Sequence, residues 1–298
     1  MRHGGIESQI MVFNPDLTSM PEIVRYRLEP EVYTFEQLRQ IVEYSRQNDV
    51  TIGIHLKLDT GMHRLGFLEN DMDELCHTLK SSKKTVVKTI FSHLASSEDE
   101  NDDQYTFSQF SKFDKMYDQI SRELGYTPKR HILNSGGISR FADHQYDYVR
   151  LGVGMYGIDN NPEIYKNLRK VHVLSASLIQ VKHLKKGDSV GYNRRTILEK
   201  DSMVGIVNIG YADGVMRCLG NRNYSYLIAG AEAPIIGNVC MDVTIVDLSN
   251  VPNAQVGMTV EIFGNQKKIE VLSESAGTIP YEILSRISSR VQRNFVRE

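Results

Sequence analysis

The chain has 298 residues, of which 41% are hydrophobic and 24% are charged, and these proportions are typical of globular proteins. Its 35 basic and 37 acidic side chains give a formal net charge of −2, which excludes a field strong enough to recruit nucleic acid or an anionic membrane surface. No apolar run reaches the roughly 18 residues that could span a bilayer, and the first residues do not have the pattern of a signal peptide. The length allows two packed domains, and we expect a small-molecule ligand, with no nucleic acid and no membrane as partners.

Cysteine occurs three times, as Cys76, Cys218 and Cys240, and no two of these residues form a CxxC pair. So few cysteines, in an odd number, argue against a secreted disulfide framework and against a structural zinc site. The sequence therefore predicts a cytoplasmic protein without a metal centre.

The first half of the sequence alternates short apolar runs with helical patterns. Residues 52, 54, 56 and 58 are apolar at every second position, as in a strand with one buried face. Between residues 107 and 124, large apolar side chains recur at spacings of three and four, and this helical pattern ends before Gly125. Further strand candidates are residues 10–13, 86–91, 130–133 and 148–153. Strands that alternate with helices predict parallel βα units, whose commonest closed form is the TIM-type (β/α)8 barrel.

Residues 1–167, which carry this pattern, are too few for a complete barrel. Such a barrel usually takes about 250 residues and rarely fewer than about 200. Residues 10–13 also have the pattern of an internal strand. We therefore predict a barrel that is incomplete at its N-terminal end, and an unusual open barrel is the alternative.

From about residue 168 to residue 298 the pattern changes to short strands separated by turns. Glycine-containing turns such as residues 186–188 and 264–265 separate the strands, and only the last stretch has a helical pattern. The predicted strands are residues 175–181, 203–209, 226–228, 233–236, 243–246 and 259–262. This half is therefore predicted to be a second, mostly antiparallel β domain.

Two polar clusters follow predicted strands of the barrel. Residues 55–66 carry Lys57, Asp59 and Arg64 at and after a strand end, which is the edge of a parallel barrel where chemistry is done. An arginine there offers a planar fork for a carboxylate or a phenolate. His93 follows the next strand. The alternative for residues 55–66 is a structural turn with a solvent-exposed arginine. The alternative for His93 is a core or surface histidine whose hydrogen bonds serve only the fold.

Two later motifs suggest that a ligand approaches the backbone. Residues 131–137 pass from a strand into a turn of small residues, where backbone amides and the Ser135 hydroxyl could hold a phosphate. Arg150 lies in a hydrophobic run, where burial of its charge is costly unless the charge has a partner. The adjacent Gly152 permits close approach to the backbone. A serine that only caps a helix and an arginine that only closes an ion pair are the alternatives.

In the second half, Tyr192 and Tyr211 each stand beside a glycine turn, and residues 237–242 form a further turn that contains Met241. Cys240 lies in an apolar run and is expected to be packed rather than reactive. Tyr281 opens the terminal helical pattern. Each of these features, taken alone, favours a structural role such as strand-end packing.

Together, the order and spacing of these motifs resemble those of alanine racemase from near residue 10 to the C-terminus. The resemblance rests on residues 55–66, 91–96, 131–137, 149–157, 190–193, 209–214, 237–242 and 278–283. It implies a pyridoxal-phosphate-binding barrel with a β domain, and a head-to-tail homodimer with shared active sites. It also implies interconversion of L-alanine and D-alanine, which supplies D-alanine for peptidoglycan.

The resemblance assigns roles to individual residues. Tyr192 matches the tyrosine that takes the α-proton from L-alanine. Arg150 matches the arginine that faces the pyridine nitrogen of the cofactor, and His93 matches the histidine that links this arginine to the tyrosine of the partner subunit. The residues that fall in the phosphate-binding motifs are Asn134, Ser135, Gly152, Val153 and Tyr281.

Further matches concern the substrate. Arg64 and Met241 match contacts to the substrate carboxylate, and Lys57 matches a lysine that is often carbamylated and orients that arginine. Tyr211 matches a tyrosine of the substrate channel. Asn238 departs from the family, because many relatives have an arginine there, and substrate access is expected to differ.

The chemistry implied by the resemblance is consistent with these residue types. Racemisation needs two bases, because the α-proton leaves one face of the substrate and returns on the other. A tyrosine acts as a base only with positive charge nearby, which a chain of Tyr192, His93 and Arg150 would supply. A protonated arginine can donate to the pyridine nitrogen without protonating it, which should disfavour side reactions such as transamination.

The family's cofactor lysine lies in a Lys-Ala-Asn-Ala-Tyr-Gly motif after the first barrel strand, and it is also the second base. The first lysine of this sequence is Lys57. We therefore expect the covalent lysine to be absent from this chain and the chain alone to be inactive. A broader-specificity amino-acid racemase and a non-catalytic, racemase-like binding or assembly protein are the alternative functions.

Overall fold

The computed structural model describes residues 1–296, and the chain divides into two compact units. The N-terminal unit comprises Met1–Met155 and Asp159–Leu168. The C-terminal unit comprises Tyr156–Ile158 and the described residues from Arg169 onward. Among the described residues, no helix combines the length and the apolar character needed to cross a membrane.

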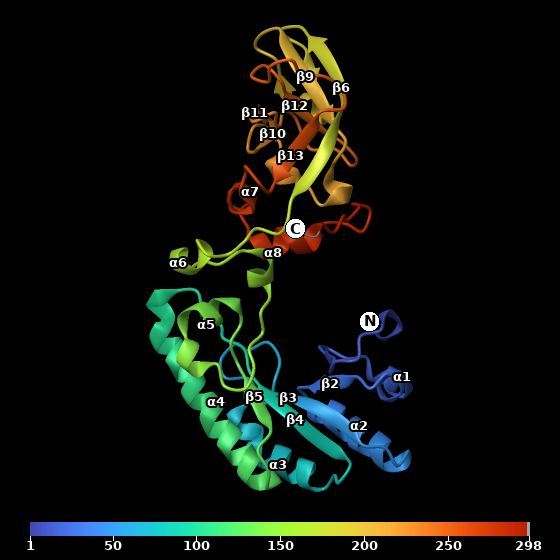
Figure 1. Ribbon diagram of the computed structural model, residues 1–298, viewed down its shortest axis with the longest axis vertical. Helices are drawn as coiled ribbons and strands as arrows, with labels where there is room; N and C mark the ends of the chain where they lie inside the picture. Colours follow the sequence, from blue (N-terminus) through green and yellow to red (C-terminus); the bar gives the residue numbers. More distant parts are fainter. Residues whose placement is uncertain (297–298) are drawn as a thin grey trace. The chain divides into compact units, whose positions relative to one another are not determined.

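The N-terminal unit is built on a parallel sheet of five strands in the order β1-β2-β3-β4-β5 (Figure 1). Each strand pairs in parallel with the next one along the chain. The strands are β1 (Met11–Val12), β2 (Glu29–Val32), β3 (Ile52–Lys57), β4 (Thr85–Phe91) and β5 (Lys129–His131). Together with the structural neighbours described below, this order confirms the expected TIM-type barrel.

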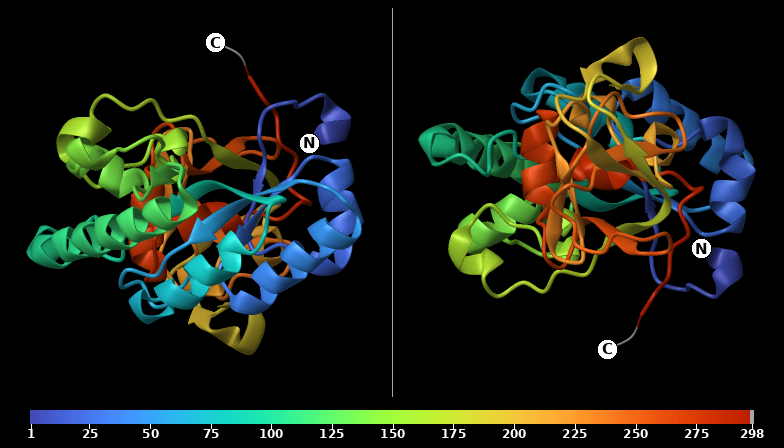
Figure 2. Two further views of the ribbon diagram at one scale, coloured as in Figure 1. Left: turned by 90° about the horizontal axis from the view of Figure 1, so that it is seen from below. Right: turned by 90° about the horizontal axis from the view of Figure 1, so that it is seen from above.

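Helices connect these strands and cover one face of the sheet, and they lie around its outer side in the two further views (Figure 2). The longest, α4, ends where Gly125 adopts a φ of 73°, a left-handed conformation that glycine tolerates. Thr34 begins α2 by accepting a hydrogen bond from the amide of Gln37. The helices of this unit are α1 (Met20–Arg25), α2 (Phe35–Gln47), α3 (Met72–Lys80), α4 (Asp103–Leu124), α5 (Ser135–Arg140) and α6 (Pro162–Tyr165).

The alternation of β3 separates two environments. Ile54 and Leu56 are fully buried in the apolar core that the helices share with the sheet. His55 and Lys57 point to the opposite face, yet they are only 6% and 7% exposed. The inner face of the sheet is therefore polar and enclosed, which is unusual for a packed core and usual for a functional site.

The prediction of a strand at residues 148–153 is wrong. This segment runs beside β5 through two backbone hydrogen bonds, from Asp147 to Arg130 and from Arg150 to Leu133, but it forms no regular ladder. The Asp147 carboxylate also accepts a hydrogen bond from the Arg130 amide. In a regular parallel ladder, that amide would donate to a backbone carbonyl of the neighbouring strand. A 3-10 turn over Val153–Tyr156 then follows.

The C-terminal unit contains a six-stranded sheet in the order β11-β10-β13-β6-β9-β12 and a two-stranded sheet, β7-β8. All pairings among these strands are antiparallel, as predicted. A bridge between Ile235 and Val246 joins the two edge strands, so the larger sheet is nearly closed. The strands are β6 (Leu174–Leu184), β7 (Ser189–Val190), β8 (Thr196–Ile197), β9 (Ser202–Val207), β10 (Ser225–Ile228), β11 (Ala231–Pro234), β12 (Thr244–Asp247) and β13 (Thr259–Phe263), and the helices are α7 (Ile269–Ala276) and α8 (Pro280–Arg286).

Candidate active site

The centre of the site in the N-terminal unit is Arg150, whose guanidinium is held by four acceptors. Its Nη1 donates to Nδ1 of His131 at 2.6 Å. Its Nη2 donates to the carbonyl oxygens of Ser92 (2.7 Å) and Ile132 (3.1 Å) and to Nδ1 of His93 (3.1 Å). These acceptors come from the ends of β4 and β5, so the parallel register of the sheet fixes the position of the arginine.

The acceptors around Arg150 are electrically neutral. Burial lowers the pKa of His93 to about 4 and that of His131 to about 3, and the positive charge of Arg150 adds to both effects. Burial also lowers the pKa of Arg150 to about 10, which still leaves it protonated at neutral pH. Glu31 opposes this shift only as a charge at longer range. Arg150 is thus a partly buried cation whose direct partners are uncharged.

The guanidinium keeps donors for a ligand. Arginine has five N–H groups and no acceptor. Within residues 1–296, neither Nε nor the second N–H of Nη1 of Arg150 has a hydrogen-bond acceptor. The neutral His93 also has a free donor, because its Nδ1 accepts from Arg150 and its proton therefore resides on Nε2. These N–H groups can bind a lone pair or an anion.

The small-residue turn after β5 gathers backbone donors around one hydroxyl. The Ser135 Oγ accepts hydrogen bonds from the amides of Gly152 at 2.9 Å and Gly154 at 3.4 Å. A Cβ added to Gly152 would lie 3.7 Å from this oxygen, in van der Waals contact. Val153, between the two glycines, is buried. Converging amides and a hydroxyl of this kind make an anion-binding concavity.

Asn134, expected in the same motif mainly as a supporting residue, contacts the backbone of the turn and a neighbouring serine. Its Oδ1 accepts from the amide of Gly137 at 2.9 Å, which caps α5, and from the hydroxyl of Ser97 at 2.8 Å. Asn134 therefore supports the turn that presents Ser135.

Lys57 and Arg64, predicted together, lie in different environments. Lys57 is buried, and its Nζ lies 3.3 Å from Oε1 of Glu31, whose side chain is 2% exposed. The same ammonium and the Arg150 guanidinium each lie 5.4 Å from the centroid of the Phe91 ring. Arg64 is exposed, and its charge contributes to the lowered pKa of His93. The site therefore concentrates positive charge.

In the C-terminal unit, Tyr192 and Met241 lie together around a surface hollow of about 580 Å³. Gly191, with a φ of 73°, turns the chain so that Tyr192 begins a 3-10 turn. The Tyr192 side chain is 65% exposed, and its hydroxyl has no hydrogen bond within the described part of the chain. The hollow is lined by Gly191, Tyr192, Cys240, Met241, Asp242 and Val243.

Backbone contacts hold the other predicted residues of this unit near the hollow. The Tyr211 amide donates to the carbonyl of Cys240 at 3.0 Å. Asn238 donates from Nδ2 to the carbonyl of Tyr192 at 3.1 Å and thereby supports the Tyr192 turn. Tyr281 lies in α8 and is 39% exposed. The structure thus brings Tyr192, Tyr211 and Met241 together, whereas Tyr281 lies apart on α8.

Sequence reasoning missed several polar residues of the inner face. Glu31, which pairs with Lys57, and Glu29, which pairs with His55, both lie on β2, a strand that was not predicted. Thr89 on β4 bridges His55 and His131. The available signal was the alternation of β3 and β4, because polar residues at inward positions of two adjacent strands indicate a polar interior.

Comparison with known proteins places this geometry in one family. The family model described as "Alanine racemase, N-terminal domain" matches residues 1–160, and "Alanine racemase, C-terminal domain" matches residues 171–295. Alanine racemase 1 of Clostridium acetobutylicum is 33% identical over 100% of this chain and 79% of that protein.

Solved structures that are similar to this chain are also alanine racemases. The alanine racemase of Streptomyces lavendulae has a TM-score of 0.91 and 29% identity, and the match covers 100% of this chain and 80% of that one. The alanine racemase of Bartonella henselae with covalently bound pyridoxal phosphate has a TM-score of 0.85 and 27% identity, and the match covers 97% and 79% of the two chains. Family models match both halves of the sequence, and both the similar sequences and the similar structures are alanine racemases. The chain therefore belongs to the alanine racemase family.

Proposed function

We propose that this protein is a pyridoxal-phosphate-dependent alanine racemase that interconverts L-alanine and D-alanine. Membership of the family supports the reaction class and the cofactor. The observation that carries the assignment is Arg150, a partly buried cation held by neutral imidazoles and carbonyls with two N–H groups left for a ligand. A purely structural arginine would instead close an ion pair with a carboxylate.

The residues present fit the cofactor. Ser135 and the amides of Gly152 and Gly154 form a concavity for a phosphate group. The free N–H groups of Arg150 would hold the pyridine nitrogen, and arginine donates without giving up its proton. Bound there, pyridoxal phosphate would withdraw electrons from the α-carbon of the amino acid and so weaken its C–H bond.

The proton acceptor on one side of the substrate is Tyr192. Its exposed hydroxyl would accept the α-proton of L-alanine, and the Nε2–H of His93 is the donor that would hold the tyrosine oxygen. Arg64 and Met241 would bind the substrate carboxylate, with Tyr211 and Asn238 at the approach to the site. Val153 and Tyr281 would complete the phosphate contacts.

A head-to-tail homodimer would bring the two clusters together. The Tyr192 hydroxyl is exposed to solvent and has no contact within the described residues that could orient it. The His93 donor belongs to the other unit. In the proposed dimer, Tyr192 and Met241 of one copy serve the Arg150 cluster of its partner, so that each copy contributes to both active sites.

Lys57 is proposed to remain a charged amine in this arrangement. Its Nζ lies 3.3 Å from the buried Glu31 carboxylate, and a carbamate at this place would put two negative groups side by side. The same ion pair argues against Lys57 as the residue that binds pyridoxal phosphate covalently. We accordingly propose that Lys57 does not fill that role. Borohydride reduction of the 298-residue chain with pyridoxal phosphate should leave no label on Lys57 in peptide mass spectra, and a labelled Lys57 would refute this.

Racemase activity is tested on the natural polypeptide that carries this sequence. L-alanine and D-alanine should each be converted to the racemic mixture with added pyridoxal phosphate, and conversion of other amino acids should be at least about tenfold slower. Comparable rates with many amino acids would favour a broader racemase. No conversion, with pyridoxal phosphate bound and the fold intact, would favour a non-catalytic binding protein.

A further inference from the structure

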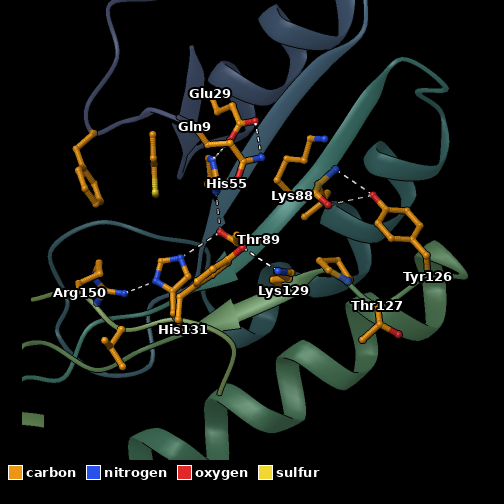
Figure 3. Close-up of a pocket in the computed structure, with 16 residues that line it drawn as sticks. Gln9, Glu29, His55, Lys88, Thr89, Tyr126, Thr127, Lys129, His131 and Arg150 are labelled. Atoms are coloured by element: carbon orange, nitrogen blue, oxygen red, sulfur yellow. Dashed lines mark hydrogen bonds and ion pairs between the residues drawn. The ribbon is translucent and has the colours of Figure 1, made fainter. Parts of the chain in front are cut away.

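A continuous chain of hydrogen bonds runs from Arg150 to Glu29 across the inner face of the sheet (Figure 3). The Arg150 guanidinium contacts Nδ1 of His131 at 2.6 Å, and Nε2 of His131 lies 3.2 Å from Oγ1 of Thr89. This hydroxyl lies 2.8 Å from Nδ1 of His55, and Nε2 of His55 lies 2.9 Å from Oε2 of Glu29. The chain thus links β2, β3, β4 and β5 to the arginine, and Gln9 and Lys88 stand beside its carboxylate end.

Arg150 sets the direction of every proton in this chain. Because a guanidinium has only donors, Nδ1 of His131 must accept, and the proton of this neutral ring must be on Nε2. His131 therefore donates to Thr89. The Thr89 hydroxyl then has its proton free for Nδ1 of His55. The remaining His55 proton is on Nε2 and is donated to Glu29, an ionised acceptor that completes the chain.

Packing alone would not determine which nitrogen of His131 carries the proton. The His131 ring stacks on Phe91 with centroids 5.0 Å apart and an interplanar angle of 10°. Stacking fixes the plane of the ring, but it is the same for either tautomer. His55, Thr89, His131 and Arg150 also border a cavity of about 650 Å³, so one side of the chain lacks the dense packing that holds core side chains. The hydrogen bonds must then select the tautomer.

We propose that Glu29, His55 and Thr89 are positioning residues that reinforce the Nε2–H tautomer of His131 set by Arg150, and so hold Arg150 toward the cofactor. The link to the cofactor rests on the proposed function, whereas the tautomers are a property of this chain alone. A carboxylate that orients a histidine through its second nitrogen is a common way to fix a ring that serves another group.

The test compares Thr89→Val, which removes only the hydroxyl, with Thr89→Ser, which keeps it. The matched control is Thr85→Val on the same strand, because the Thr85 hydroxyl bonds Ser82 and lies outside the chain. Proton–nitrogen spectra of the histidine-labelled 298-residue protein report the tautomers, with signals assigned from His131→Gln and His55→Gln. In the unsubstituted protein, both rings should carry their proton on Nε2, and the His131 Nε2–H should exchange slowly with water.

In Thr89→Val the His131 Nε2–H signal should be lost to exchange, while Thr89→Ser and Thr85→Val should retain it. In the natural polypeptide, kcat should fall about five- to tenfold in Thr89→Val, as expected for the loss of one neutral hydrogen bond, and Thr89→Ser should restore it. A proton on Nδ1 of His131 in the unsubstituted protein would overturn the proposal. So would identical spectra of the Val and Ser variants. If no racemase activity exists at all, the spectra still test the chain, and the failure falls on the proposed function.

Discussion

The two clusters of predicted site residues, one in each unit, differ in how they are held. In the N-terminal unit, Arg150 is surrounded by four acceptors and His93 and His131 are kept neutral by burial. In the C-terminal unit, Tyr192 is 65% exposed, and its backbone carbonyl is held by Asn238 while its hydroxyl has no bond among the described residues. One cluster is preorganised by its own sheet, and the other presents a reactive group on a surface.

This difference indicates what each cluster requires. A partly buried cation without a negative partner is stabilised by a ligand that offers a lone pair or a negative charge, which here is the proposed cofactor. An exposed phenol is a poor general base until water is excluded and a donor orients it. The proposed dimer would meet the second requirement. The predictions below test each cluster separately, from the largest expected effect to the smallest.

The largest effect is expected for Tyr192→Phe, which keeps the ring and removes the hydroxyl. Loss of a positioned general base typically costs about 10²–10⁴-fold in rate, so racemisation by the natural polypeptide with its cofactor lysine should fall by this factor in both directions. Exchange of the D-alanine α-proton with solvent deuterium should survive better, because that step uses the other base. Tyr156→Phe, at an exposed tyrosine outside the hollow, is the control. Equal loss of exchange from both enantiomers would remove Tyr192 from its assigned role.

Acid should destabilise the N-terminal unit through its buried histidines. The unfolded chain takes up protons on His93 and His131 below about pH 6.5, whereas the folded chain keeps them neutral down to about pH 4 and about pH 3, respectively. The unfolded state therefore binds more protons in this window, and stability falls as the pH falls. Chemical denaturation between about pH 6.5 and about pH 4 should show a loss on the order of 5 kcal/mol, shared about equally by the two histidines. The free energy of unfolding of His131→Gln should fall less over the same pH range than that of the unsubstituted protein. An equal fall in the two proteins would contradict the prediction.

Arg150→Lys keeps the charge but not the planar fork. A lysine cannot reach His131, His93 and two carbonyls at once, so buried acceptors lose their donors, at a cost of about 1–3 kcal/mol in the free energy of unfolding. Urea unfolding measures this effect. Arg39→Lys is the control, because Arg39 is 64% exposed and its ion pair with Glu74 should contribute little. A loss no larger than that of the control would show that the hydrogen bonds of Arg150 are unimportant to stability.

The smallest effect is expected for Asn238→Ala, which removes the hydrogen bond to the Tyr192 carbonyl. Because this bond lies at the surface, kcat should fall only about two- to threefold, with little change in stability. Asn167→Ala, which removes an exposed amide from the N-terminal unit, should change neither quantity. A loss as large as that of Tyr192→Phe would mean that Asn238 has a direct role in the reaction.

The sequence predicted those features of the fold that depend on local periodicity. The alternation of residues 52–58 and the three–four spacing up to Leu124 correspond to β3 and α4. Strand β2 was missed because Glu29, Pro30 and Glu31 have low strand propensity, and their inward carboxylates are stabilised only by partners on β3. Residues 148–153 have strand composition but lie beside β5 without a ladder.

For the site, the sequence indicated that a buried Arg150 needs a partner, and the motif order indicated which residues gather around it. The identity of those partners was not predictable, because two imidazoles and two carbonyls are brought together only by the register of β4 and β5. The chain from Glu29 to Arg150 spans four strands, so no local pattern contains it. The roles of the individual site residues stay predictions.

Mixing two defective variants tests most directly whether the buried cluster and the exposed cluster act together between two copies. The variants are Tyr192→Phe, which lacks the proposed proton acceptor, and Arg150→Ala, which lacks the group proposed to hold the pyridine nitrogen; in the natural polypeptide each should be nearly inactive alone. In a mixed dimer, the intact Arg150 cluster of the first would meet the intact Tyr192 of the second. With equal amounts and full subunit exchange, half of the dimers are mixed and each holds one working site, so about a quarter of normal activity should return. No recovery, despite exchange shown with differently tagged copies, would contradict a shared active site.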